Sequence, residues 1–231
     1  MFTGLIETTG TVLAVEHREG SMRIAVAAPL VQGTVLRTGD SIAVSGVCLT
    51  ALDIEPDAAP PRFHADLAAE TVARTSLSLL APGSTVNLEL PTPAGTPLGG
   101  HVVQGHVDGT GTLLGLQPVD APVDAHADLT RADWWLRVAV PAPLSRYMVE
   151  KGSIAIEGIS LTIARWEPGT AEGDVVSVAI IPHTYARTNL HTLRAGQPVN
   201  IEADVLIKFM EQRVLETRFD LSVEYLIANG Y

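Results

Sequence analysis

The chain has 231 residues, of which 46% are hydrophobic and 18% charged, a balance typical of a globular protein rather than a disordered one. The formal net charge of -11 disfavours nucleic acids and anionic membrane surfaces as partners. The single cysteine, Cys48, excludes a disulfide or a cysteine-based zinc site within one chain and favours a reducing compartment.

The first residues of the chain lack the basic start and the long apolar stretch of a signal peptide. No apolar run elsewhere approaches the ~20 residues that a membrane span needs. We therefore expect a cytoplasmic protein with no membrane contact.

Short apolar stretches that alternate with small or polar residues predict an all-β architecture. They are rich in Val, Ile and Thr, which suit a pleated, half-buried surface, and Gly and Asp punctuate them. The clearest strands of the first half span 11–15, 22–27, 41–44 and 86–90, and a short helix is expected within 69–80. A closed or nearly closed barrel would hide the edges of about six such strands.

The second half of the chain repeats the first, segment by segment and in the same order. The matching pairs are FTGLIETTGTVLAV with VQGHVDGTGTLLGL, IAVAAPL with VAVPAPL, GDSIAVSGVCLT with KGSIAIEGISLT, ETVARTSL with HTYARTNL, and GSTVNLEL with GQPVNIEA. The chain is thus two copies of one unit of about 100 residues. We place the first unit at 1–98 and the second at 99–204.

Three segments complete the pattern. A helix within 184–193 is the counterpart of the one in the first unit, and the Pro-, Asp- and Ala-rich stretch 118–133 is expected to be a surface insertion. Helical spacing takes over in the tail, 205–231, where Asp220 would cap a last helix that Gly230 ends. This helix would form an oligomer contact or pack back on its own barrel.

The corresponding loops GVCLT and GISLT carry candidates for chemistry. Each places a small side chain, Cys48 or Ser160, two residues before a threonine, so alternation along a strand would aim both side chains at one face. Cys48 alone would be explained as a small hydrophobic residue in a core. Ser160 at the matching position favours a functional face, because a hydroxyl has less reason to lie in an apolar core.

Histidines are the second group of candidates. His101 and His106 are five residues apart and cannot share a strand face, which argues against a metal pair. His101 follows two glycines, which fits close approach of the backbone to a ligand, and an imidazole there could shuttle protons near neutral pH. Among weaker candidates, Glu70 has the alternative of a solvated helix residue and Lys151 that of a turn charge.

Several motifs of common enzyme classes are missing from the sequence. It contains no G-x-G-x-x-G after a strand, no G-x-x-x-x-G-K-[ST], no H-E-x-x-H and no G-x-S-x-G. Dinucleotide-binding folds, P-loop nucleotide hydrolases, zinc proteases and α/β-hydrolases are therefore disfavoured.

The repeated strings resemble the riboflavin synthase family over almost the whole chain. The strings are MFTGLIE, GDSIAVSGVCLT, ADLAAETVARTSL, GGHVVQGHVDG, VEKGSIAIEGISLT, IIPHTYARTNL and VNIEADVL. The resemblance implies two tandem six-stranded Greek-key β-barrels and a C-terminal α-helix that assembles a homotrimer. It also implies that two molecules of 6,7-dimethyl-8-ribityllumazine dismutate to riboflavin and 5-amino-6-(D-ribitylamino)uracil, with no metal or redox cofactor.

In that family a working site forms between the first barrel of one subunit and the second barrel of another. By motif position, the first-barrel site would contain Gly4, Leu5, Ile6, Cys48, Leu49, Thr50, Asp66, Leu67, Ala68, Ala69, Glu70, Thr71, Gly100, His101 and Val102, with Ser41 nearby. The second-barrel site would contain Lys151, Ser160, Leu161, Thr162, Ile181, Pro182, His183, Thr184, Tyr185 and Ala186, with Asp204 nearby.

The resemblance also implies roles. Ser41, Cys48 and His101 would activate or stabilise the adduct. The partner lumazine would be served by Ser160, Thr162 and Asp204.

Two departures from the family pattern are Ser45, where an asparagine is usual, and Val102, where a larger apolar residue is common. Neither removes a residue that the chemistry needs, although both could alter ligand affinity.

The main alternative is a non-catalytic protein that holds a lumazine or flavin as an antenna or carrier. In such relatives the second barrel has lost its ligand-binding residues. This chain retains Lys151, Ser160, Thr162, His183 and Asp204, which favours an enzyme. A flavin reductase barrel is a third interpretation, disfavoured because the chain has no nicotinamide-binding domain.

Overall fold

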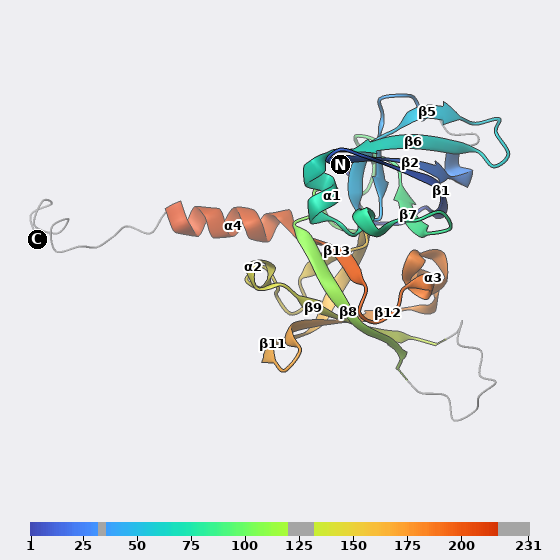
Figure 1. Ribbon diagram of the computed structural model, residues 1–231. Coiled ribbons are helices and arrows are strands. Elements are labelled where there is room, and N and C mark those ends of the chain that lie inside the picture. The colour runs from blue at the N-terminus through green and yellow to red at the C-terminus, as the bar shows by residue number, and fades with distance from the viewer. Residues whose placement is uncertain (32–35, 120–131, 217–231) are drawn as a thin grey trace, which may run out of the picture.

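A computed structural model describes residues 1–31, 36–119 and 132–216. It contains two β units, with the first above the second in Figure 1. The first unit comprises β1 (Thr8–Arg18), β2 (Ser21–Ala27), η1 (Pro29–Val31), β3 (Ser41–Val44), β4 (Val47–Thr50), β5 (Leu52–Glu55), β6 (Arg62–Leu67), α1 (Ala69–Arg74), η2 (Ser76–Leu79) and β7 (Thr85–Glu89). The second comprises β8 (Gly109–Pro118), β9 (Trp134–Val140), α2 (Ala142–Ser145), β10 (Ser153–Ile156), β11 (Ile159–Thr170), β12 (Gly173–Ile180), α3 (Pro182–Arg187), η4 (Asn189–Thr192) and β13 (Pro198–Ala203), followed by α4 (Val205–Glu216).

The two units share one strand order, which confirms the predicted tandem all-β fold. The second unit is a closed barrel in the order β10-β11-β12-β9-β8-β13, and the first is a curled sheet in the order β4-β3-β7-β1-β2-β6-β5. The first unit has seven strands rather than the six predicted, because the segment that forms one strand in the second unit is divided here at Ala51 into β4 and β5. Ala51 exchanges backbone hydrogen bonds with the turn at Gly39 and Asp40, as the equivalent Ile163 does with Lys151 and Gly152. The matching segment of the second unit is the continuous strand β11.

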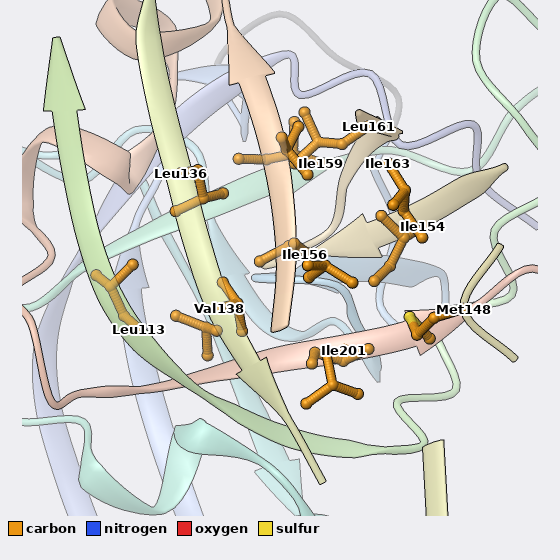
Figure 2. Packing of buried hydrophobic residues seen from close by; sticks show 14 of the residues in the cluster. Leu113, Leu136, Val138, Met148, Ile154, Ile156, Ile159, Leu161, Ile163 and Ile201 are labelled. Carbon is orange, nitrogen blue, oxygen red and sulfur yellow. The ribbon is translucent and has the colours of Figure 1, made fainter. Parts of the chain in front are cut away.

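Alternation along the strands builds a separate core inside each unit. In β6, Phe63, Ala65 and Leu67 are buried, while the residues between them are more exposed. Figure 2 shows the core of the second unit, where Leu136, Ile154 and other aliphatic side chains converge from facing strands. Each such side chain contributes about 1.5–3 kcal/mol on burial, so the barrels are rigid supports for the loops between their strands.

Each of the two predicted helices is divided in the structure. α1 is followed by η2 after Thr75, and α3 by η4 after Thr188. Both threonines have an extended backbone, with φ of -123°. Each hydroxyl donates a hydrogen bond to the carbonyl four residues earlier, at 2.6 Å for Thr75 and 2.8 Å for Thr188. This local bonding competes with continuation of the α-helix.

Helix α4 confirms the predicted change to helical structure in the tail. It extends away from both barrels (Figure 1) and leaves Leu206, Phe209 and Met210 between 55% and 65% exposed. The last helix predicted between Asp220 and Gly230 lies outside the described residues, as does most of the insertion, 120–131. Within the described ranges, no helix is long and apolar enough to cross a membrane.

Candidate functional site between the two units

The two units meet where the β3–β4 turn faces the β10–β11 turn. Gly46 and Gly158 lie at the contact with φ of +81° and +79°. A Cβ on either glycine would lie 2.6 Å from the backbone nitrogen of the other. Only glycine allows this approach, and the equivalence of the two contacts gives the pair of units an approximate two-fold symmetry.

Side-chain amides join the units across this pseudo-two-fold axis. Asn87 Nδ2 donates a 2.9 Å hydrogen bond to the carbonyl of Glu157. At the equivalent position, Asn200 Nδ2 donates a 2.9 Å bond to the carbonyl of Ser45. Both asparagines are almost completely buried, so these bonds are shielded from competing water.

Glu157 breaks the symmetry, because its counterpart is Ser45. Its carboxylate accepts hydrogen bonds from the Asn200 backbone at 2.8 Å, Asn189 Nδ2 at 2.9 Å and the Ser76 hydroxyl at 3.2 Å. Burial raises the pKa of Glu157, and these hydrogen bonds offset part of the rise. Glu157 also lines a cleft of about 340 Å³ between the units, which lies apart from the predicted lumazine residues.

Two further buried glutamates fix the start of each unit. Glu89 accepts backbone hydrogen bonds from Thr3 at 2.6 Å and Gly4 at 3.0 Å. Glu202 accepts the equivalent bonds from the backbone of Gln104 at 2.7 Å and Gly105 at 2.9 Å. Burial raises the pKa of both glutamates, and the backbone donors offset only part of the rise. Sequence reasoning missed these residues, although the repeated Val-Asn-x-Glu pattern carried the signal.

The segments held by the glutamates cross to the opposite unit. Ser160 donates its backbone N–H to the carbonyl of Gly4, and Cys48 donates to the carbonyl of Gly105, both at 2.8 Å. A Cβ at Gly4 would lie 2.7 Å from Ser160, and one at Gly105 would lie 2.6 Å from Cys48. Ser160 and Cys48 thus occupy equivalent positions, each covered by the first residues of the other unit.

In addition to these equivalent backbone contacts, Ser160 has a side-chain partner, His101, that has no equivalent at Cys48 among the described residues. His101 Nδ1 lies 2.7 Å from Ser160 Oγ, and the other ring nitrogen, Nε2, is buried without a hydrogen-bond partner among the described residues. Burial lowers the pKa of His101, and the negative charge of Asp204 opposes that effect. The structure thus places His101, predicted with the first-barrel residues, against Ser160 of the second unit and within electrostatic reach of Asp204.

Cys48 has an apolar setting. It is half-buried and packs against a small cluster between the units, formed by Phe2, Ala43, Val103 and Ala155. Ser41 pairs with Thr50 on the adjacent strands β3 and β4. The pairing of Ser153 with Thr162 is equivalent in the second unit. Both Thr50 and Thr162 are exposed, as alternation predicts for the outer face of a barrel.

Three predicted binding residues have their side chains in the barrel cores. Leu49, Leu67 and Leu161 are each 9% exposed or less, and Figure 2 shows Leu161 within the core cluster. They could meet a ligand only through their backbone. By contrast, Ile181 is 57% exposed at the start of α3, and Leu5 is 51% exposed.

Other predicted residues lie on the surface. Asp66 pairs with Arg23 on the outside of the first unit, and Glu70 pairs with Arg74 on α1. Ala68, Ala69, Lys151, His183 and Ala186 are exposed, whereas Ile6, Thr71, Val102, Pro182 and Thr184 are partly buried. Gly100 packs on Ser160: a Cβ there would lie 3.1 Å from the serine Cβ. The Tyr185 ring stacks on Trp134 with centroids 4.2 Å apart.

The sequence profile described as "Lumazine binding domain" matches this chain twice, at residues 3–91 and 104–204. The chain belongs to the riboflavin synthase family of paired lumazine-binding domains. A riboflavin synthase of Mycobacterium tuberculosis is 42% identical over 212 residues, covering 92% of this chain and 97% of the relative. Riboflavin synthases of Actinobacillus pleuropneumoniae and Bacillus subtilis are 38% and 34% identical, and the alignments cover 100% of both chains in each case.

Solved structures show the same fold at lower identity. LumP complexed with riboflavin has a TM-score of 0.70 at 22% identity, covering 88% of this chain and 99% of LumP. LumP complexed with 6,7-dimethyl-8-(1'-D-ribityl) lumazine has a TM-score of 0.68 at 21% identity, with the same coverage. The paired lumazine-binding fold is therefore common to this riboflavin synthase family member and to LumP.

Proposed function

We propose that this protein is a riboflavin synthase. It would convert two molecules of 6,7-dimethyl-8-ribityllumazine into riboflavin and 5-amino-6-(D-ribitylamino)uracil, acting as a transferase of a four-carbon fragment. One lumazine loses the fragment that the other gains, so the reaction balances without an external oxidant or reductant. The enzyme would need no metal or redox cofactor and would work in the cytoplasm.

The pair formed by Ser160 and His101 carries this proposal. The imidazole has one nitrogen at the Ser160 hydroxyl and the other buried without a partner among the described residues. A buried, unpaired ring nitrogen is costly unless a ligand completes its hydrogen bonding. Such a nitrogen can give or take a proton at the bound substrate, and Asp204 would stabilise the protonated ring.

The substrate would supply much of the reactivity. The 7-methyl protons of the lumazine are unusually acidic, so the molecule can provide its own carbanion. The protein must hold two flat rings face to face, and orientation of this kind contributes ~7–11 kcal/mol. Backbone amides near Leu49 and Leu161 would meet the pyrimidinedione edge, and polar side chains would bind the ribityl hydroxyls. General acid–base groups would add ~10²–10⁴ in rate.

We further propose a homotrimer, in which the first unit of one subunit faces the second unit of another. The exposed apolar side chains of α4, Leu206, Phe209 and Met210, support this assembly, because apolar side chains that the described residues leave exposed on a helix are suited to a subunit contact. Sedimentation equilibrium of the purified protein would give three times the chain mass. A monomer at micromolar concentration would contradict the proposed assembly.

The decisive experiment adds 6,7-dimethyl-8-ribityllumazine to the purified protein without any cofactor and follows riboflavin by absorbance and chromatography. We expect one riboflavin for every two lumazines.

We expect Ser160→Ala and His101→Ala to lower kcat by about 10²-fold or more, while lumazine binding, measured by fluorescence, persists. Tight binding without riboflavin would instead establish a lumazine or flavin carrier, and normal turnover of both variants would refute their roles.

A further inference from the structure

Asp204, whose charge acts on His101, is held by helix α4. The chain leaves β13 at Ala203 and enters α4 at Val205, so Asp204 is the cap between them. Its carboxylate accepts the backbone N–H of Leu206 at 2.9 Å, which satisfies one of the free donors at the helix start. Its carbonyl accepts the backbone N–H of Lys208 at 3.3 Å. The position of the Asp204 carboxylate therefore depends on where the first turn of α4 lies.

Lys208 ties that first turn to the second unit. Its ammonium group lies 3.0 Å and 2.9 Å from the two carboxylate oxygens of Asp108, in the segment that enters β8. The side chains are only 22% and 21% exposed, so solvent screens this pair less than a surface ion pair.

Asp108 is itself fixed to the strand that precedes Asp204. Its side chain accepts the backbone N–H of Ala203 at 2.8 Å, and its own N–H donates to the carbonyl of Ile201 at 2.9 Å. The ion pair with Lys208 thus closes a loop of bonds around Asp204: strand to Asp108, Asp108 to Lys208, and Lys208 back to the Asp204 carbonyl. Breaking the pair would release α4 on one side of the cap.

Lys208 also balances the negative charge around this cap. It lowers the pKa of Glu202, whereas Asp108 raises it. Glu202 holds the backbone of Gln104 and Gly105, a few residues beyond His101. For the equivalent Glu89 in the first unit, the charge that acts is Glu7, which is also negative. The positive charge of Lys208 therefore acts on the buried glutamate of the second unit, which also contains the Ser160–His101 pair.

We propose that Lys208 is a positioning residue for the second-unit half of the active site. By pairing with Asp108 it fixes the first turn of α4, and so it fixes the position of the Asp204 carboxylate, which accepts the Leu206 N–H of that turn. This inference rests on the proposed riboflavin synthase activity. It makes the seating of α4 on its own unit a condition for proton transfer at Ser160 and His101.

The test compares Lys208→Met, which keeps the aliphatic stem, with Lys208→Arg, which can pair with a carboxylate through two donors. Asp108→Asn breaks the same ion pair from the other side and retains an acceptor for Ala203. Glu211→Gln is the matched control, because it removes a different ion pair of α4, with Arg146, at 3.3 Å. The measurements are kcat and KM for the lumazine, the melting temperature and the sedimentation coefficient.

We expect Lys208→Met and Asp108→Asn to lower kcat about 10- to 100-fold, the scale of loss from misplacing a catalytic group, with KM changed less than about threefold. Lys208→Arg should recover most of the kcat, and Glu211→Gln should retain it. The inference is overturned if folded Asp108→Asn turns over normally, if Arg is no better than Met, or if Glu211→Gln loses as much. A wild-type protein that binds lumazine without converting it overturns the proposed function instead.

Discussion

Glu157 shows how one residue makes two similar units chemically different. It stands where the first unit has Ser45, and it is 3% exposed among amide and hydroxyl donors. Burial disfavours the ionised carboxylate, so the pKa of Glu157 lies above its ordinary value of 4.5. Below pH 4.5 both the folded and the unfolded chain carry the proton, and the stabilising contribution of the group is fully present. That contribution is lost as the pH rises through the folded-state pKa.

A neutral replacement of Glu157 tests whether its pKa is raised in the folded state. In Glu157→Gln the side chain cannot ionise, so its stability deficit relative to wild type should be greatest near pH 4.5 and should shrink as the pH rises. The slope should approach about 1.4 kcal/mol for each pH unit, because one proton is linked to folding. Urea unfolding at several pH values gives the difference, and other buried glutamates cancel from it. A deficit that grows with pH would contradict a raised pKa.

At the scale of single elements, the β3–β4 and β10–β11 turns, which face each other, strictly limit which residue can occupy their contact positions. Gly158 has φ of +79° and no room for a Cβ against Gly46, whereas Gly196 has φ of +88° and nothing within 4 Å of such an atom. The two glycines therefore separate the conformational cost of a side chain from the steric one. The conformational part is ~1–2 kcal/mol for a non-glycine residue in the left-handed region.

We expect Gly196→Ala to lower the free energy of unfolding by about that amount. Gly158→Ala should cost at least twice as much, because its Cβ would overlap backbone atoms that cannot rotate away. Denaturant titration of both variants gives the comparison. Equal losses would mean that the turns separate easily and that the units are not closely joined at this point.

The sequence predicted these elements well where the signal is local and less well where it is not. Alternation and the repeat located the strands and the tandem units, because both are properties of neighbouring residues. The division of the helices at Thr75 and Thr188 was missed, since a hydroxyl bonding back to the chain has no periodic signature. The contact of His101 with Ser160 joins residues 59 apart in sequence, and family resemblance alone had grouped them in different half-sites.

At the scale of the whole molecule, we expect the two units to unfold as one cooperative structure. Their buried contact contains the reciprocal bonds of Asn87 and Asn200 and an apolar cluster that includes Phe2 and Val103 from opposite units. Separating the units would expose the apolar cluster to water and exchange these buried hydrogen bonds for bonds to water, at ~0.5–1.5 kcal/mol for each hydrogen bond. Unfolding of either unit should therefore carry the other with it.

The distribution of reporter residues makes this testable. The three tryptophans, Trp134, Trp135 and Trp166, all lie in the second unit, and the single cysteine, Cys48, lies in the first. Phe63→Ala removes a side chain buried in the core of the first unit alone, yet it should lower stability by about 3–5 kcal/mol whether measured by tryptophan fluorescence or by labelling of the thiol. A shift in thiol labelling with an unchanged fluorescence midpoint would show that the units unfold independently.

The reciprocal bonds of Asn87 and Asn200 have a consequence for ancestry. A contact in which each partner offers the same group to the same place on the other is the form taken by a homodimer. A single ancestral barrel with one such asparagine would already have paired with its own copy, so joining two gene copies in tandem would have needed no new interface. Such a fusion would then have freed the copies to diverge. The serine and glutamate now found at equivalent positions beside the axis, Ser45 and Glu157, together with His101 at the start of the second unit, would record that divergence.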